Sequence, residues 1–526
     1  MAIKAGQAKK LSRRSFLKFV GGASLAGVTL NLAGCGQPIT AEKAIGGSGW
    51  MPTQYNTPGN WPTNVRGRVA IDSANPSIVR DDQKCILCGQ CIEVCEKVQS
   101  VYGNYELPIK KEIVCVNCGQ CIQWCPSGAI SERDDIDKVL KAIATPNITV
   151  VVQTAPSTRI GLGEEFGLPV GINVQGKQVA ALRKLGFDVI FDTNFTADLT
   201  IMEEGTELVK RVKGELKKPT PQMTSCCPGW VKFVEYFYPD LIPNLSSAKS
   251  PQQMEGTLIK TYFAEKKNVD PKKIFSVAIM PCTAKKFECQ RPEMASARNE
   301  SKDKDVSPDV DVVLTTRELA RMIKRAGIDF PSLPEEEYDQ LMGSGTGAGA
   351  IFGTTGGVME AAVRSAYYLI TGKQPPSSLW NLTPVRGMQG VKEAAVNIPG
   401  IGNLKVAVIS GLANARKVMD QVRAGNAPWV FMEVMACPGG CQYGGGQPRA
   451  SSPPSDEDRN RRAASLYNID ANSKLRNSHD NPQIKQVYAD FLTTPMSEKA
   501  EKLLHTNYIS RAEEFVAKKS EGSKLY

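Results

Sequence analysis

Short runs of apolar, β-branched residues alternate with longer stretches of mixed polarity through the centre of the chain. The runs are ITVVVQTAP (148–156), FDVIFDT (187–193), IFSVAIM (274–280), VDVVLTT (310–316), LKVAVISG (404–411) and WVFMEVM (429–435). Runs of this length and composition are typical of buried strands, and the intervening stretches are long enough for helices. The alternation predicts an α/β domain over residues 145–450, with parallel sheets flanked by helices.

The flanking regions lack this alternation. A chain of 526 residues is too long for one hydrophobic core, so we expect separate domains. Residues 35–75 are mostly rich in Gly, Pro, Asn and Thr, which predicts a flexible tether. Residues 451–460 are polar and contain proline, which predicts a loop. The sequence KAEKLLHTNYISRAEEFVAKK (499–519) predicts a helix within a C-terminal segment, 456–520.

The first 34 residues carry the features of a Tat/lipoprotein signal peptide. SRRSFLK (12–18) precedes a weakly apolar stretch, 19–34, which is too short and too rich in glycine to be a good spanning helix. This pattern predicts export of the folded protein by the Tat translocase. LAGC (32–35) resembles a lipobox, which predicts lipid attachment to Cys35 and a periplasmic or extracytoplasmic membrane anchor. A basic disordered tail and a chance LAGC are the alternatives.

The net charge of +10 does not indicate a nucleic-acid partner. Without the first 34 residues the net charge is +4. These 34 residues contain no acid and six basic residues: Lys4, Lys9, Lys10, Arg13, Arg14 and Lys18. No basic, aromatic-lined stripe remains to follow a phosphate backbone.

Eight of the fifteen cysteines form two C-x₂-C-x₂-C-x₃-C runs: Cys85, Cys88, Cys91 and Cys95, then Cys115, Cys118, Cys121 and Cys125. Paired runs of this kind bind two [4Fe–4S] clusters, and the fourth cysteine of each run ligates the other cluster. We therefore expect an α+β, 2[4Fe–4S] ferredoxin-like domain over residues 76–140. One cluster would use Cys85, Cys88, Cys91 and Cys125, and the other Cys95, Cys115, Cys118 and Cys121. A zinc ribbon, the alternative, needs four ligands for each site and not eight interleaved ones.

Five further cysteines lie in three stretches. TSCCPGW (224–230) contains Cys226 and Cys227, MPCTAKKFE (280–288) contains Cys282, and FMEVMACPGGCQYGGGQP (431–448) contains Cys437 and Cys441. The last two stretches place cysteines at the carboxyl ends of predicted strands, where α/β sheets bind ligands. All three match the active-site signatures of the [FeFe]-hydrogenases in order and without a gap, and the chain resembles this family from about Asp82 to about Leu503. Buried cysteines that merely pack as small hydrophobes are the alternative.

The resemblance implies two lobes with the active site in the cleft between them. It implies that Cys227, Cys282, Cys437 and Cys441 bind a [4Fe–4S] cluster, and that Cys441 bridges to a two-iron subcluster with carbonyl, cyanide and dithiolate ligands, forming the H-cluster. Lys285 matches the lysine that meets a cyanide. The other matching pocket positions are Pro156, Ser157, Gln252, Met280, Phe352 and Met435. On the residues alone, ordinary core packing of Met280, Phe352 and Met435 is as expected as a pocket role, and a solvated surface position is the default for Lys285.

The resemblance also implies a proton route. Cys226 matches the residue that passes protons between cofactor and protein, and the outward path would use Glu207, Ser246, Glu204 and Arg211. Glu204, Glu207 and Arg211 have helical spacing and share one face, which by itself would more often be a solvated face. The remaining candidates, Cys289, Arg462, Tyr467 and His479, are expected to have packing or surface roles.

Together these features predict an exported, membrane-tethered enzyme for reversible oxidation of H₂ to protons and electrons. Maturation proteins would insert the cofactor, and electrons would leave for a carrier such as a c-type cytochrome or a ferredoxin, with H₂ uptake as the expected direction. The resemblance also implies that residues 456–520 correspond to a wrap that is a separate small subunit in some exported members. A hydrogen sensor would be expected to lose Cys226 or to gain a signalling domain. An iron–sulfur assembly protein would lack the two-iron pocket and the export signal.

Overall fold

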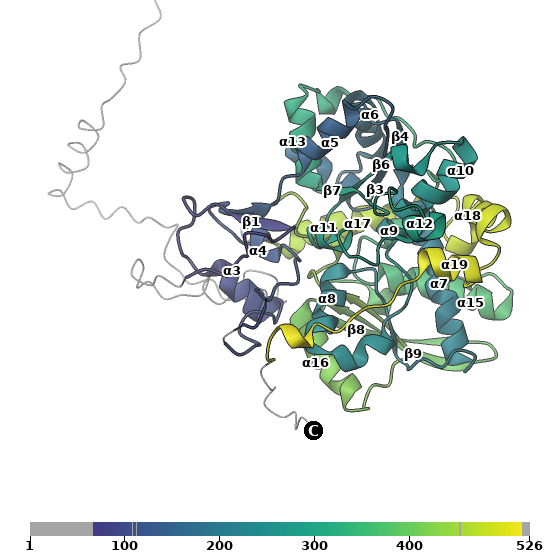
Figure 1. The fold of residues 1–526 in the computed structure, drawn as a ribbon. Coiled ribbons are helices and arrows are strands. Elements are labelled where there is room, and N and C mark those ends of the chain that lie inside the picture. The colour runs from purple at the N-terminus through teal and green to yellow at the C-terminus, as the bar shows by residue number, and fades with distance from the viewer. Residues whose placement is uncertain (1–66, 108, 112, 452–453, 518–526) are drawn as a thin grey trace, which may run out of the picture.

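The computed structural model describes residues 67–107, 109–111, 113–451 and 454–517. The predicted signal, Cys35 and most of the predicted tether lie outside these residues. The described chain forms two sheet-based lobes and a small module at the left of Figure 1.

The first lobe contains a parallel sheet of order β4-β3-β6-β7. Its strands are β3 (Thr149–Thr154), β4 (Val189–Asp192), β6 (Ile274–Met280) and β7 (Val312–Thr315). Successive side chains of β3 point to opposite faces. Val150 and Val152 pack with α5 (Ile136–Ile143), α6 (Gln175–Leu185) and α13 (Thr316–Arg325). Val151 packs with α7 (Thr193–Val212) and α9 (Pro251–Leu258). The sheet is therefore covered on both faces, as its continuous apolar runs predict.

The second lobe contains a mixed sheet of order β5-β10-β9-β8. Its strands are β5 (Gln222–Met223), β8 (Val391–Ile398), β9 (Gly402–Ser410) and β10 (Phe431–Met435). Strand β10 is parallel to β5 and β9, whereas β8 is antiparallel to β9. The prediction of parallel sheets was therefore wrong for β8. This edge strand alternates exposed and buried residues, so it lacks the continuous apolar run of the buried strands.

The predicted active-site cysteines follow strands of both lobes. Cys282 follows β6, Cys437 follows β10, and Cys226 and Cys227 follow β5 and precede α8 (Pro228–Phe237). The carboxyl ends of β6 and β10 therefore meet between the lobes, with α7 packed against both sheets' cores.

The N-terminal module is built on two similar halves. A short antiparallel pair joins β1 (Ile78–Arg80) to β2 (Ile130–Glu132), and each cysteine run contains a one-turn helix, α3 (Gln90–Glu93) or α4 (Gln120–Gln123). Residues 67–75, which the sequence assigns to the tether, pack onto this module, since Val69 and Asn75 are buried. The module therefore begins nearer Gly67 than residue 76.

The C-terminal segment contains α17 (Asp456–Asn472), α18 (Pro482–Val487) and α19 (Glu498–Leu504). The predicted loop at 451–460 was wrong from Asp456 onward, because Ser455 caps a helix whose first turn holds three acidic residues. The predicted helix at 499–519 was also wrong between His505 and Ala517, the last of its residues that the structure describes. The helix stops at Leu504 because the backbone of residues 504–506 pairs with residues 247–249. The chain then continues without regular structure, shown in yellow in Figure 1, to a short 3₁₀ helix, Ala512–Glu514.

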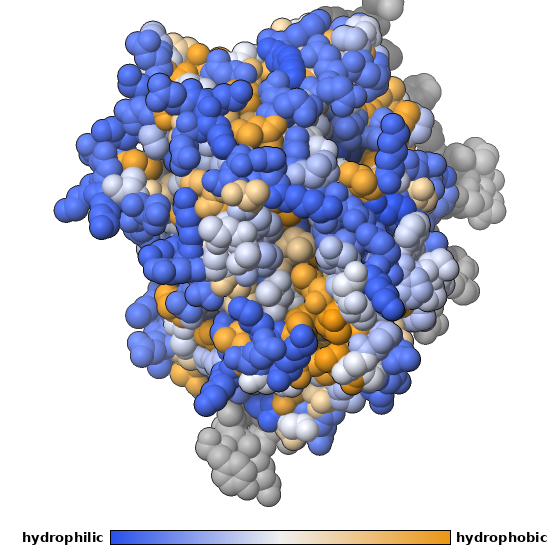
Figure 2. Space-filling model, turned by 90° about the vertical axis from the view of Figure 1, so that its right-hand side faces the viewer, coloured by the Kyte–Doolittle hydropathy of each residue, from blue (hydrophilic) through white to orange (hydrophobic). Residues whose placement is uncertain are grey.

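Apolar side chains of the second lobe are not all enclosed. Tyr367, Ile370 and Leu404 are only partly buried against its core. Figure 2 shows one face of the molecule, on which hydrophilic residues predominate and an apolar strip crosses the lower half. Among the described residues, no helix combines the length and the apolar character needed to cross a membrane.

Candidate active site

A cavity lies between the two lobes, and its wall is formed by residues of both. Every position that the resemblance assigns to the active-site metal or to the pocket wall lines it: Pro156, Ser157, Cys227, Gln252, Met280, Cys282, Lys285, Phe352, Met435, Cys437 and Cys441, together with Cys226. Residues more than 280 positions apart in the chain thus meet around one space.

The chemistry of this lining fits an iron–sulfur group. The described cysteines form no disulfide, and the described residues contain no group of three His, Cys, Asp or Glu side chains arranged to hold a single metal ion. Four thiols of the predicted set line the same cavity, and thiolates are the usual ligands of iron–sulfur clusters. Two buried atoms of the wall, Ser157 Oγ and Gln252 Oε1, have no hydrogen-bond partner within the described protein.

Lys285 presents a buried ammonium group at the cavity wall. Its Nζ donates to Glu288 Oε2 at 2.9 Å and to Cys226 O at 3.1 Å. Burial alone would lower the pKa of Lys285, but the Glu288 carboxylate outweighs this effect and the pKa is raised. The side chain is therefore charged and fixed, and it is not the solvated lysine that the sequence alone allows.

Glu207 lies at the centre of a buried polar chain below the cavity. Its Oε1 accepts from Arg211 Nη2 (2.7 Å) and Lys218 Nζ (2.9 Å), and its Oε2 accepts from Ser246 Oγ (2.9 Å). Burial would raise the pKa of Glu207, but the two cations lower it to about 2. Glu207 is therefore ionised at neutral pH.

Glu204, which is close enough to both Glu207 and Cys226 to affect their charges, and Cys226, which lines the cavity, carry protons instead. Burial, reinforced by the charge of Glu207, raises the pKa of Glu204 to about 8. Burial, and to a smaller extent the negative charge of the Glu204 carboxylate, raises the pKa of Cys226 well above its ordinary value. Glu204, Glu207 and Arg211 are all buried, so this face of α7 is not solvated.

Two further cavities in the N-terminal module are lined by cysteines. One is lined by Cys85, Cys88, Cys91 and Cys125, and the other by Cys95, Cys115, Cys118 and Cys121. These are the two interleaved sets that the spacing predicts. Backbone N–H groups of Val69 and Asn117 point at Cys91 Sγ and Cys115 Sγ, each at 3.4 Å.

The second of these cavities adjoins the active-site loops. Thr283 Oγ1, next to Cys282, donates to Asn117 O at 2.7 Å, and Gln120 Nε2 donates to Tyr443 O at 3.1 Å. A Cβ atom on Gly445 would lie 2.4 Å from Cys118 O, so only glycine fits this contact. The backbones of the two cysteine-bearing regions therefore touch.

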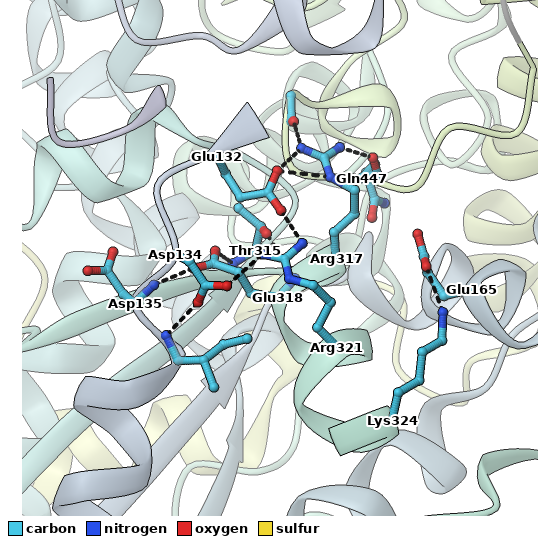
Figure 3. Close-up of polar contacts among 12 residues, drawn as sticks. Glu132, Asp134, Asp135, Glu165, Thr315, Arg317, Glu318, Arg321, Lys324 and Gln447 are labelled. Carbon is cyan, nitrogen blue, oxygen red and sulfur yellow. Dashed lines mark hydrogen bonds and ion pairs between the residues drawn. The ribbon is translucent and has the colours of Figure 1, made fainter. Parts of the chain in front are cut away.

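A charged network fastens the module to the first lobe (Figure 3). Glu132 accepts from Arg317 Nε at 3.0 Å and from Arg321 Nη1 at 2.6 Å, and Arg317 also donates to Gly445 O at 2.7 Å. Burial would raise the pKa of Glu132, but Arg317 and Arg321 lower it to about 2. Arg317 therefore contacts both the N-terminal module and the glycine-rich loop after Cys441.

The sequence interpretation missed the role of Arg462. This side chain is fully buried and donates to Glu164 Oε2 (2.6 Å), Gln442 O (3.0 Å) and Pro448 O (2.9 Å). It therefore fastens the loop that carries Cys441, rather than pairing at the surface. The sequence gives no signal of this role, because Arg462 is one of three arginines in a polar stretch, with Arg459 and Arg461. Cys289 donates to Lys286 O at 3.3 Å and lines none of the three cysteine-lined cavities.

Comparison with known proteins agrees with this arrangement. Residues 148–445 match the family described as "Iron only hydrogenase large subunit, C-terminal domain", and residues 456–511 match "Iron hydrogenase small subunit". The chain is 46% identical over 453 residues to the NADP-reducing hydrogenase subunit HndD of Solidesulfovibrio fructosivorans, covering 83% of this chain and 75% of that protein. It is 48% identical over 371 residues to the periplasmic [Fe] hydrogenase large subunit of Nitratidesulfovibrio vulgaris, covering 70% and 85%.

Solved structures give the same answer. The [FeFe]-hydrogenase HydA1 from Chlamydomonas reinhardtii superposes with a TM-score of 0.63 at 41% identity, covering 72% of this chain and 99% of that one. Proteins with another role also match, but less closely. The cytosolic iron-sulfur assembly component 3 of Pongo abelii is 30% identical over 482 residues, covering 90% of this chain and 92% of that protein.

Iron–sulfur assembly proteins are thus also related to this chain. The hydrogenases are more similar to it in sequence, and the cavity retains the complete set of residues that match the hydrogenase pocket. The chain belongs to the iron-only hydrogenase family and is an oxidoreductase that acts on H₂.

Proposed function

We propose that this enzyme catalyses 2H⁺ + 2e⁻ ⇌ H₂ at an H-cluster held between the two lobes. The observation that carries the proposal is the convergence of Cys227, Cys282, Cys437 and Cys441 on one cavity. These four thiolates would hold the cubane part, and Cys441 would bridge to the two-iron part. When bound, the cofactor supplies an open iron site and a basic amine for heterolytic splitting of H₂.

The protein's own residues orient this group and handle the protons. The charged Lys285 would donate a hydrogen bond to an anionic ligand such as cyanide, which is stronger than a neutral contact. Pro156, Ser157, Gln252, Met280, Phe352 and Met435 would enclose the two-iron part, which the protein holds by shape and hydrogen bonds.

Protons would leave the cavity through Cys226 and then Glu204, Ser246, Glu207 and Arg211. This order exchanges the two glutamates of the predicted path, because Glu204 is the carboxyl that acts on Cys226 and Glu207 is the one that pairs with Arg211. Cys226 and Glu204 hold protons near neutral pH, whereas Glu207 is ionised, so donors and an acceptor follow one another along the route. Ser246 Oγ lies 2.9 Å from Glu207 Oε2, within reach for proton transfer.

Electrons would pass through two [4Fe–4S] clusters in a ferredoxin-like module. The two cysteine-lined cavities support this relay, and the contact of Gly445 with Cys118 O supports transfer between its inner cluster and the active site. The external carrier would be a c-type cytochrome or a ferredoxin.

The sequence supports export by the Tat translocase and a lipid on Cys35, although both features lie outside the described residues. One relative is named as periplasmic and another as NADP-reducing, and the signal of this chain favours the periplasmic side. H₂ uptake follows from that location. Mass spectrometry of the mature protein should detect acyl chains on an N-terminal Cys35, and an unmodified Cys35 would refute the anchor.

Infrared spectroscopy of the matured protein tests the catalytic proposal. Metal-bound carbonyl and cyanide should absorb in a window that protein leaves empty, and the same sample should exchange D₂ with solvent protons. A sample with full relay iron but without these bands and without exchange would refute the proposal. Bands with negligible turnover would favour the sensor alternative.

A further inference from the structure

The C-terminal segment reaches the proposed proton route at its extended part. Thr506 N donates to Ser247 O and Lys249 N donates to Leu504 O, each at 2.8 Å. Ser246 N in turn donates to Met223 O of β5 at 2.7 Å. Residues 504–506 therefore pair with a strip that itself pairs with β5, and they cover its open edge.

The side chain of His505 joins two residues that are sequence neighbours of the route, Ser247 and Glu203. Its Nδ1 lies 2.9 Å from Ser247 Oγ, and its Nε2 lies 3.0 Å from Glu203 Oε2. Glu203 is fully buried and precedes Glu204 on α7, while Ser247 follows Ser246. His505 thus links the helix that carries Glu204 to the turn that carries Ser246.

Further contacts of the same segment hold Glu203. Tyr488 OH donates to Glu203 Oε1 at 2.5 Å, and Met496 N donates to Glu203 Oε2 at 2.8 Å. The carboxylate is therefore fixed by three groups of the C-terminal segment, with His505 as the one that also touches Ser247.

The Ser246–Ser247 turn supplies two hydrogen bonds to one carboxylate oxygen of Glu207. Ser246 Oγ (2.9 Å) and Ser247 N (3.0 Å) both donate to Glu207 Oε2. Ser225 Oγ donates to Ala248 O at 2.7 Å, which ties the same turn to the residue before Cys226. A displacement of the turn would therefore move two donors to Glu207 and the backbone beside Cys226.

We propose that His505 is a positioning residue of the proton route, and that the C-terminal segment acts through it to hold the Ser246–Ser247 turn against Glu207. This inference rests on the route proposed above. His505 is not among the residues that line the cavity, and its side chain hydrogen-bonds to Ser247 and Glu203, so we expect its effect to fall on proton transfer. Misplacing groups in a reaction path by about 1 Å can cost about 10²-fold in rate.

The test uses D₂ exchange with solvent protons and the infrared spectrum of the matured full-length enzyme. His505→Ala should slow exchange about tenfold or more while the carbonyl bands and the iron content stay unchanged. His505→Asn retains a polar atom near the Nδ1 position and should recover most of the rate. His505→Gln retains one near the Nε2 position, which contacts Glu203 only, and should recover less.

His479, the other histidine of the chain, is a matched control in the same segment. Its Nδ1 also lies beside a serine hydroxyl, Ser365 Oγ, at 3.0 Å, and its ring stacks on Tyr368. His479→Ala should leave D₂ exchange unchanged.

Equal losses in the His479 and His505 variants would mean general loosening of the segment and would overturn the inference, as would unchanged exchange in His505→Ala. Altered infrared bands in His505→Ala would place its action at the cofactor and would also overturn it. If His505→Ala does not fold, equal rates for the Asn and Gln variants would count against it. Cys226→Ala separates the two proposals. Normal D₂ exchange in Cys226→Ala would refute the proton route itself. Loss of exchange in Cys226→Ala together with normal exchange in His505→Ala would refute only the inference about His505.

Discussion

Two boundaries of the cavity, one toward the N-terminal module and one toward α7, differ in the kind of contact that forms them. Toward the N-terminal module, main-chain atoms approach one another, with Gly445 against Cys118 O and Thr283 hydrogen-bonded to Asn117 O. Toward α7, the contacts are made by the ionisable and hydroxyl side chains of Glu204, Glu207 and Ser246.

This difference matches the proposed role of each boundary, which is electron transfer toward the N-terminal module and proton transfer toward α7. An electron needs closeness between two metal groups, and a glycine provides it by removing the Cβ atom that would separate them. A proton needs successive donors and acceptors, and opposite pKa shifts in two carboxyls of one helix provide them. The two boundaries can therefore be disabled separately.

Cys441→Ala should have the largest effect, because Cys441 would join the two parts of the cofactor at the point where both boundaries meet. We expect loss of the carbonyl and cyanide bands and loss of all H₂ turnover, with the module's iron retained, as measured by infrared spectroscopy and iron analysis. Cys289→Ala is the control, because this buried thiol lines none of the cysteine-lined cavities. Full activity of Cys441→Ala would contradict the ligand set.

Cys226→Ala should disable the proton boundary alone. We expect an intact infrared spectrum and a loss of turnover and D₂ exchange of about 10²- to 10⁴-fold, the usual contribution of a group that transfers protons. Turnover close to that of the unmodified enzyme would remove Cys226 from the mechanism.

Gly445→Ala should disable the electron boundary alone. The added methyl group meets Cys118 O, and overpacking of this kind costs about 1–3 kcal/mol, which would displace the module. Turnover coupled to a dye or an electrode should fall, whereas D₂ exchange, which needs no external electrons, should continue. Thr283→Val should have a similar but weaker effect, and Thr283→Ser should not. Parallel loss of exchange would mean that the glycine acts on the cofactor pocket.

Glu132→Gln should have the smallest effect on activity and should act on docking of the module. The folded-state pKa of Glu132, about 2, lies below its ordinary value of 4.5, so its stabilising contribution is complete above pH 4.5 and is lost as the pH falls toward 2. The shift corresponds to roughly 3 kcal/mol. Unfolding followed between pH 5 and 2 should show less pH dependence in Glu132→Gln than in the unmodified protein, and identical profiles would contradict this role.

Much of the architecture was predictable because it depends on local pattern. Each of the six apolar runs contains a strand, since a continuous apolar run of that length has to be buried on both faces. Strand β8 was missed because its alternating exposure resembles no buried strand, and the helix predicted beyond Leu504 was wrong because pairing with residues 247–249 outweighs helix propensity.

The site divides in the same way. Cysteine spacing predicted which cysteines would share each of the two cavities of the N-terminal module, because the members of each set are close in the sequence. The burial of Lys285 and the opposite pKa shifts of Glu204 and Glu207 depend on partners such as Glu288 and Lys218, and spacing alone does not give their charge states.

The sequence by itself determined the thiols, their order and the strands that deliver them, because short-range spacing and hydrophobic runs specify these. Only the tertiary structure decided that Arg462 fastens the loop after Cys441 and that His505 touches Ser247 and Glu203. The physical reason is that a lone polar side chain has no pattern of its own, and its role is set by partners that burial brings to it from distant parts of the chain.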